Sequence, residues 1–171
     1  MTELRTITTD RLHLRPISPA DFPHWREFYS TDHSHFVGGP RSAEDAWWKV
    51  CQFVGHWSMR GFGYWSVETK EGTYCGRVGL EQPHEWPEPE LGWSFLPSAT
   101  GKGYATEAAQ AVLDDAKATL KPKAVVSFVH KDNIASIKVA ERMGATADAK
   151  SGYDCPYPEH LIYRHPMGCA A

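Results

Sequence analysis

The fold of this chain is decided by one stretch, Thr100-Gly101-Lys102-Gly103-Tyr104-Ala105-Thr106-Glu107-Ala108. It follows a strand-like run and precedes a helix-like run. Glycine allows a sharp turn and lets a ligand approach the backbone N–H groups closely. A helix that begins after Gly103 would point its unpaired N–H groups and the positive end of its dipole at the turn. That arrangement binds phosphate, although a plain strand-to-helix turn could have the same residues.

The two common nucleotide-binding fingerprints do not fit this turn. It lacks the earlier glycine and the Gly-Lys-Ser/Thr ending of a Walker motif. Thr106 occupies the third glycine position of the dinucleotide fingerprint, and the turn lies late in the chain instead of after the first strand. A phosphate-bearing ligand of another kind is therefore expected.

The composition is that of an ordinary globular protein. The chain has 171 residues, of which 42% are hydrophobic and 23% charged, enough for one domain with a sizeable core. We expect a single domain over residues 1–171, with its core at roughly 8–165. The formal net charge of −3 gives no basic surplus that would favour nucleic acid or an anionic membrane as the partner.

The sequence favours a cytoplasmic location. No apolar run approaches the roughly 20 residues of a membrane helix, and residues 1–6 lack the apolar core of a signal peptide. The cysteines are scattered and form no Cys-x-x-Cys pair, so free thiols in a reducing compartment are expected. They are Cys51, Cys75, Cys155 and Cys169.

Helices and strands alternate on both sides of the glycine turn. Ser18 and Ser42 each precede an acidic residue by three positions, which is a helix-start signal. Hydrophobic periodicity predicts helices at 18–29, 42–61, about 16 residues after Gly103, and 133–144. Strands are expected at 12–15, 64–69, 74–80, 90–96, 125–129 and 161–163. This order predicts an α/β (α+β) fold with a mixed sheet, antiparallel at first, and helices on both faces.

A second segment gives the turn a context. Asn133-Ile134-Ala135-Ser136, followed by Gly144-Ala145, lies about 30 residues after the turn. Together with the opening Thr9–Pro16, these motifs resemble the GNAT superfamily of acyl-CoA-dependent N-acyltransferases. The closer resemblance is to the subgroup that includes the ribosomal-protein N-terminal acetyltransferases, and it spans roughly residues 8–165. Thr100 departs from the arginine, glutamine or tryptophan usual at that position, which matters little if backbone N–H groups hold the phosphate.

The resemblance implies a GNAT fold whose mostly antiparallel sheet is splayed at its centre, between the strands of Trp93 and Val126. Acetyl-CoA would lie in that cleft as the co-substrate. Its pantetheine arm would pair with the backbone near Phe95 and Leu96, and Asn133 would contact the pantetheine amides or cap its helix. The pyrophosphate would rest on the turn, on Gly101, Lys102, Gly103, Tyr104 and Ala105.

The implied reaction is attack of an amine on a thioester. It needs a base for the amine proton and an acid for the leaving thiolate. Glu90, at the start of its strand and opposite the apolar face, is the first candidate for the base, and Glu88 is the second. Ser136 is the candidate for the acid. The residues alone leave plainer alternatives open, a solvated strand-end carboxylate for Glu90 and an ordinary first-turn serine for Ser136.

Other polar residues are weaker candidates for a functional role. Tyr163 and His130 are further acid–base candidates, each readily explained as structural. The histidines and cysteines, including His33-x-His35 and Cys155-x4-His160, have no metal-site spacing, so no metal is expected.

The sequence does not identify the amine or the oligomeric state. It is compatible with a homodimer. It also leaves two other functions open, a non-catalytic acyl-CoA-binding module of the same fold and a phosphate-binding protein unrelated to CoA.

Overall fold

The structure, a computed structural model, describes residues 5–149 and 154–168. The expectations for the first four residues and for Cys169 lie outside the described residues. Eight strands of the described part form one sheet in the order β1-β2-β3-β4-β5-β6-β8-β7. The strands are β1 (Ile7–Thr8), β2 (Leu12–Pro16), β3 (Tyr64–Thr69), β4 (Tyr74–Glu81), β5 (Glu90–Phe95), β6 (Val126–His130), β7 (Thr146–Ala147) and β8 (His160–Arg164).

The helices begin close to the predicted start signals. They are α1 (Phe22–Tyr29), α2 (Ala43–Arg60), α3 (Tyr104–Thr119) and α4 (Ile134–Arg142), with 3₁₀ segments η1 (Pro19–Asp21), η2 (Asp32–Val37) and η3 (Pro97–Ala99). The Ser42 hydroxyl accepts the Asp45 N–H at 3.1 Å, and Gly61 ends α2 with φ +76°. The helix expected from residue 18 starts as the 3₁₀ turn η1, because the Asp21 carboxylate turns back to accept the N–H of Ser18 at 2.8 Å.

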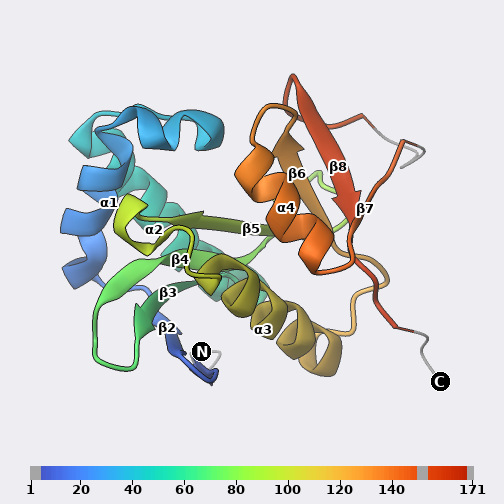
Figure 1. Ribbon diagram of the computed structural model, residues 1–171, viewed down its shortest axis with the longest axis horizontal. Coiled ribbons are helices and arrows are strands. Elements are labelled where there is room, and N and C mark those ends of the chain that lie inside the picture. The colour runs from blue at the N-terminus through green and yellow to red at the C-terminus, as the bar shows by residue number, and fades with distance from the viewer. Residues whose placement is uncertain (1–4, 150–153, 169–171) are drawn as a thin grey trace.

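The helices cover both faces of the sheet (Figure 1). On β3, Trp65 and Val67 pack in the core that α3 covers, whereas Tyr64 packs in the core that α1 and α2 cover. The α4 residue Ala140 joins a smaller core with Val129 of β6. Alternate residues of a strand point to opposite faces, and the two-sided arrangement follows from apolar side chains on both faces of β3.

The sheet is splayed at its centre, between β5 and β6. All other neighbouring strands run antiparallel, whereas β5 and β6 run parallel and pair only at Glu90 and Val126. In Figure 1, β6 and β8 lie steeply across the direction of β5. Just past the pairing point, the Ser127 hydroxyl donates to the Leu91 carbonyl at 2.5 Å. The splayed, mostly antiparallel sheet that the resemblance implied is therefore confirmed.

A buried carboxylate just before α1 bonds to side chains of β2 and β3. Asp21 is only 2% exposed, and it accepts two hydrogen bonds from Arg15 at 2.7 and 3.0 Å and one from the Ser66 hydroxyl at 2.7 Å. Burial alone would raise the pKa of Asp21, but the hydrogen bonds from Arg15, Ser18 and Ser66 lower it below the ordinary value of 3.8. The network stabilises the fold only while Asp21 is ionised.

We predict that Asp21→Asn lowers the free energy of unfolding by about 2 kcal/mol at pH 7, since hydrogen bonds to a charged group contribute that much. The difference from the wild type should shrink as the pH falls through the lowered pKa of Asp21, where the wild type loses the same interaction. Urea denaturation at pH 7 and pH 3 measures both effects. Asp10→Asn, at an exposed position, is the control, and equal losses in the two variants would contradict the role of Asp21.

Candidate active site

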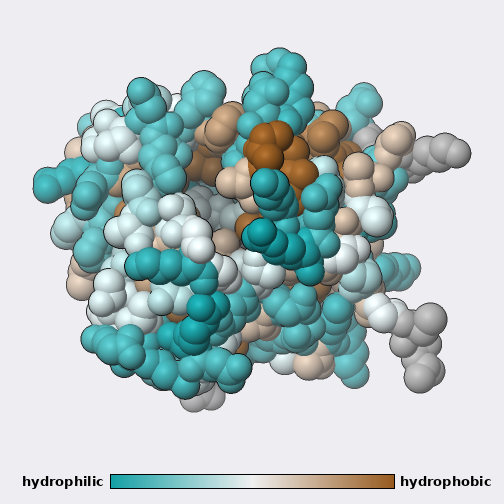
Figure 2. Space-filling view, viewed as in Figure 1, coloured by the Kyte–Doolittle hydropathy of each residue, from teal (hydrophilic) through white to brown (hydrophobic). Residues whose placement is uncertain are grey.

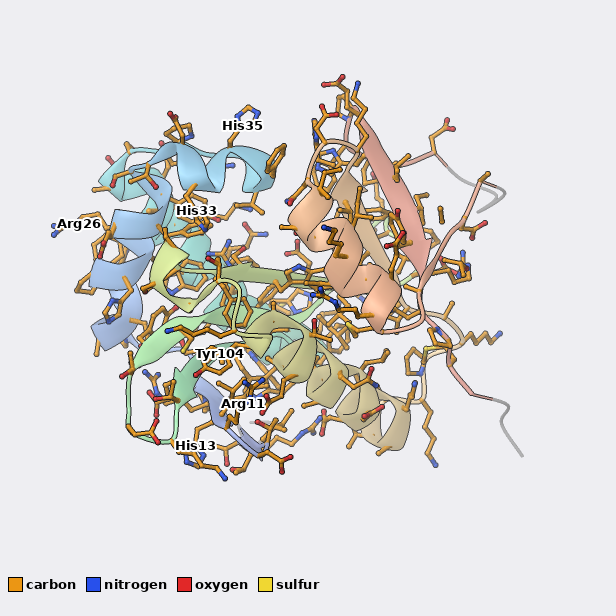
Figure 3. The ribbon with its side chains drawn as sticks, viewed as in Figure 1. Arg11, His13, Arg26, His33, His35 and Tyr104 are labelled. Carbon is orange, nitrogen blue, oxygen red and sulfur yellow. The ribbon has the colours of Figure 1, made fainter. Side chains whose placement is uncertain are left out.

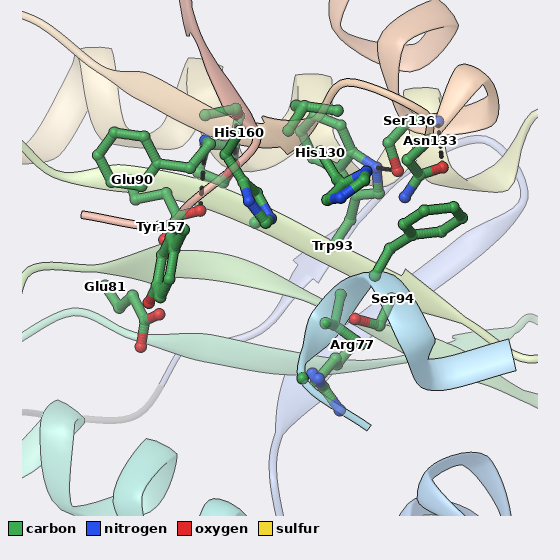
Figure 4. A pocket seen from close by; sticks show the side chains of 18 of the residues that line it. Arg77, Glu81, Glu90, Trp93, Ser94, His130, Asn133, Ser136, Tyr157 and His160 are labelled. Atoms are coloured by element: carbon green, nitrogen blue, oxygen red, sulfur yellow. Dashed lines mark hydrogen bonds between the residues drawn. The ribbon is translucent and has the colours of Figure 1, made fainter. Parts of the chain in front are cut away.

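A cavity of about 330 Å³ lies at the splay. Its walls come from both separated strands, from the η2 region, and from the segment before β8 (Figure 4). The main predicted site residues Glu90, Asn133 and Ser136 line it together, as does the further acid–base candidate His130. The space-filling view shows hydrophobic side chains over α4 on the face seen in Figure 2.

Glu90 is a buried carboxyl at the point where the two strands meet. It is 8% exposed, and one of its oxygens accepts the Phe128 N–H of β6 at 3.4 Å. The pKa of Glu90 is raised to about 8, first by burial and second by the negative charge of Glu81. A carboxyl whose pKa lies near the working pH is ionised in a fraction of the molecules, and that ionised form can take a proton from a bound group, as a general base does.

Ser136 lies at the other end of the cavity, in the first turn of α4. Its N–H is accepted by the Asn133 side chain at 3.1 Å, so Asn133 is the helix cap that the sequence allowed. Its hydroxyl oxygen accepts the Trp93 indole N–H at 3.3 Å. Because Trp93 occupies the oxygen as a donor, the hydroxyl hydrogen of Ser136 is left to bond another acceptor.

The glycine turn has the backbone that the phosphate hypothesis requires. Gly101 and Gly103 have φ of +74° and +80°, a conformation that side chains rarely adopt. Among the described residues no side chain caps α3. The first N–H groups of α3 therefore point at the turn, and no capping side chain of the described residues accepts a hydrogen bond from them.

The turn is held from outside by the N-terminal part of the chain. The Arg11 guanidinium donates to the Lys102 carbonyl at 2.9 Å and to Glu107 at 2.7 Å. Thr9 adds a hydrogen bond to Glu107 at 2.6 Å. Figure 3 shows Arg11 beside Tyr104, and its guanidinium carbon lies 4.9 Å from the Tyr104 ring centre. These contacts give Glu107 a structural role that its place in the motif did not reveal.

The edge of β5 that faces the cleft is only partly used. Leu96, one of the residues predicted to pair with pantetheine, donates its N–H to the Cys75 carbonyl of β4 at 2.8 Å, on the edge away from the cleft. On the cleft-facing edge, the Phe95 carbonyl contacts His33 Nε2 at 2.9 Å. Successive residues of a strand direct their backbone groups to opposite edges. The groups of Trp93 therefore face the cleft between the occupied carbonyls of Leu91 and Phe95, and neither Phe95, Leu96 nor residues 101–105 line the cavity.

The remaining predicted residues have other contacts. Glu88 is held by Arg164 through two hydrogen bonds of 2.8 and 3.1 Å and does not line the cavity. Tyr163 packs in the small core under α4. His130 does line the cavity, with its ring 5.1 Å from that of Phe36.

Three further findings concern metals, thiols and membranes. Within residues 5–149 and 154–168, no group of three or more histidine, cysteine or acidic residues could hold a metal ion. The described cysteines, Cys51, Cys75 and Cys155, are free thiols. No helix of the described part is long and apolar enough to cross a membrane.

Sequence reasoning missed several cavity residues. Glu81 is the cross-strand partner of Glu90, and it lies one residue past the end predicted for its strand. Tyr64 approaches so closely that a Cβ at Gly92 would be 2.0 Å from its hydroxyl oxygen, which explains the glycine in β5. Tyr157 comes from the segment before β8. The antiparallel pairing of the 74–80 and 90–96 strands was the only signal that could have placed Glu81.

Comparison with known proteins identifies the family. The family model described as acetyltransferase (GNAT) domain matches residues 11–146. The crystal structure of an acetyltransferase from Agrobacterium tumefaciens is 37% identical, with a TM-score of 0.90, and the match covers 96% of this chain and 95% of that one.

Two further proteins are similar to this chain, one in sequence over part of its length and one in fold. The Bacillus subtilis protein YnaD, described as an uncharacterized N-acetyltransferase, is 36% identical over 55 residues, and the alignment spans 32% of each protein. The ribosomal α-N-protein acetyltransferase RimL, solved with coenzyme A, shares the fold at 17% identity and a TM-score of 0.74, over 94% of this chain and 96% of RimL. The chain belongs to the GNAT family of acyl-CoA-dependent N-acyltransferases.

Proposed function

We propose that this protein transfers an acetyl group from acetyl-CoA to a primary amine by direct attack, without a covalent enzyme intermediate. The observation that carries the proposal is the cavity at the splay, which has the buried carboxyl of Glu90 at one end and the hydroxyl of Ser136 at the other. RimL, which has the same fold, was solved with coenzyme A, and this supports acetyl-CoA as the donor.

The donor would be held by backbone groups. The N–H groups from Gly101 to Ala105 would bind the pyrophosphate, since a helix N-terminus attracts anions. The pantetheine arm would pair with the cleft-facing edge of β5, as an added strand does. That edge is offered by Trp93, because Leu96 already bonds to β4 and Phe95 to His33.

The chemistry would divide two protons between two residues. The acceptor would bind as an ammonium ion. Glu90 would take the first proton from it, directly or through one water molecule, and the neutral amine that results attacks the thioester carbon. The C–N bond forms, the C–S bond breaks, and the thiolate leaves with a proton relayed through Ser136. The second nitrogen proton replaces the one that Ser136 gives up. The indole of Trp93 holds the Ser136 hydroxyl in place for this transfer.

We extend the proposal to the chain as a whole. Residues 1–171 would form one N-acetyltransferase domain whose partners are acetyl-CoA and the amine acceptor, with no nucleic acid or membrane involved. The free thiols of Cys51, Cys75 and Cys155 support a reducing, cytoplasmic location.

The role of Glu90 leads to a kinetic prediction. Glu90→Gln keeps the shape of the side chain but cannot accept the proton, so kcat should fall about 100-fold while the Kd of acetyl-CoA stays unchanged. Thiol release over a panel of amines measures kcat, and calorimetry measures the Kd. Glu85→Gln, at an exposed loop position, is the control. An unchanged kcat in Glu90→Gln removes Glu90 from the mechanism.

The same carboxyl predicts the pH dependence. Because the pKa of Glu90 is raised to about 8 and only the ionised form accepts a proton, kcat/KM should rise with pH to a plateau above 8. In Glu90→Gln the rise with this midpoint should disappear. Repeating the profile with an amine of different pKa separates the enzyme group from the acceptor. A midpoint that follows the amine in both proteins would contradict the assignment.

The glycine turn leads to a binding prediction. Gly103→Val places a branched side chain at a φ of +80°, which strains the turn and blocks the approach of the pyrophosphate, so the Kd of acetyl-CoA should rise at least about tenfold. Gly72→Val is the matched control, since Gly72 has a φ of +84° in the β3–β4 turn. Equal affinities for acetyl-CoA in the two variants would contradict the pyrophosphate site. Binding of CoA without thiol release would indicate a non-catalytic acyl-CoA-binding module.

A further inference from the structure

Two carboxylates face each other at one end of the cavity. Glu81 of β4 and Glu90 of β5 are direct cross-strand partners, and both line the cavity. Cross-strand partners point to the same face of a sheet, with Cβ atoms about 4.5–5.5 Å apart. Figure 4 shows both carboxyl groups beside Tyr157, at the end of the cavity away from Ser136.

Like charges this close are unfavourable unless something positive lies between them. Burial raises the pKa of Glu81 as well as that of Glu90. Among the described residues, no lysine, arginine or histidine nitrogen lies within 4 Å of either carboxylate. The groups that act on the pair from farther away are Lys49 and His56 of α2, Arg77 of β4, Tyr64 of β3, and Cys155 and Tyr157. Glu90 is thus buried and Glu81 half-buried, and within the described residues neither forms a close ion pair with a cation.

We propose that Glu81 and Glu90 together bind the ammonium group of the acceptor, and that the acceptor is a singly charged aliphatic primary amine. The inference rests on the proposed acetyl transfer and adds the class of substrate and a binding residue, Glu81. Amines of this class carry a positive charge at neutral pH, and that charge supplies what the pair lacks. An arylamine, which is neutral at this pH, gains nothing from two carboxylates.

The walls around the pair fit the carbon part of such an amine. Trp86, Phe128 and Tyr157 pack edge to face with ring centres 5.0 to 6.0 Å apart, and two of them, Phe128 and Tyr157, line the cavity. Aromatic faces attract both apolar groups and cations. The acceptor therefore meets an apolar wall beside the carboxylates.

Three cationic side chains on the cavity wall argue against a polycation. Arg41, Lys49 and Arg77 all line the cavity, and none has a carboxylate within 4 Å in the described part of the chain. A second ammonium group would face these three cations, which repel it. One positive charge is thus favoured at the carboxylate pair, and a second one is disfavoured.

The proton balance of the step is complete. The ammonium ion binds to the ionised pair, which releases to solvent any proton that the pair held before. Glu90 then takes one proton from the nitrogen, and the neutral amine attacks the thioester. The sum is an ammonium ion and acetyl-CoA giving an N-acetylamine, CoA thiol and one proton, which leaves Glu90 for solvent after the product departs.

Binding without turnover tests the site most directly. N,N-dimethylbenzylamine is a singly charged amine that cannot form a stable amide, and benzyl alcohol is its neutral counterpart. With CoA-loaded protein in calorimetry at pH 7, the charged probe should bind at least about tenfold more tightly than the alcohol, an advantage of roughly 1.4 kcal/mol. It should also release protons, detected as a heat that changes with the buffer.

Glu81→Gln should abolish the preference for the charged probe, while Glu81→Asp should keep part of it and Glu85→Gln all of it. An unchanged acetyl-CoA affinity shows that each variant is folded. In turnover, benzylamine should be used at least tenfold better, by kcat/KM, than either aniline or spermidine.

The outcomes separate the two proposals. If benzylamine is acetylated but Glu81→Gln changes neither the probe's Kd nor the KM of benzylamine, the ammonium site is overturned and acetyl transfer stands. If the charged probe binds in a Glu81-dependent way but no thiol is released, the ammonium site stands and the enzymatic proposal fails. Equal use of aniline or spermidine overturns the substrate class.

Discussion

The parallel pairing of β5 and β6 at one position, Glu90 with Val126, is the constraint on which the rest of the site depends. A buried backbone group that loses its strand partner must find another. The Leu91 carbonyl finds the Ser127 hydroxyl, and the Phe95 carbonyl finds His33. Side chains thus satisfy the backbone of β5 at both ends of the gap, whereas the middle of its edge, at Trp93, faces the cleft. An opening in a sheet becomes a binding groove because only selected groups are satisfied internally.

The splay also explains why an acid can stay buried beside it. Glu90 ends the paired part of β5, so its carboxyl reaches the first unpaired N–H groups of β6 and accepts that of Phe128. On the other side β4 continues the regular ladder and brings Glu81 opposite. Removing two carboxyls from water is costly, and a protein that keeps them in one cavity stores a preference for protons or cations there.

The sequence predicted the elements better than it predicted their contacts. Local chemistry placed the start of α2 at Ser42 and the sharp turn at Gly101–Gly103, because a cap or a positive φ depends on neighbouring residues. The position of Glu90 on the cavity side of β5 followed from simple alternation along one strand. Glu81, by contrast, depends on the register between two strands, and the bond from Trp93 to Ser136 joins residues 43 positions apart. Such contacts are set by how the layers pack, which no local pattern records.

The hydrogen bonds from Arg11 to Glu107 and to the Lys102 carbonyl affect which changes the protein tolerates at the N-terminal edge of the sheet. Residues 96 positions apart hold the turn, and Arg5 extends the same attachment along α3 by bonding Asp115 at 3.1 Å. The segment from Arg5 to Arg11, which includes β1, therefore fixes the turn to which we assign donor binding. Under the proposed function, tags, fusions and strand exchange at this edge would change the affinity for the coenzyme while leaving the chemistry of the cavity untouched.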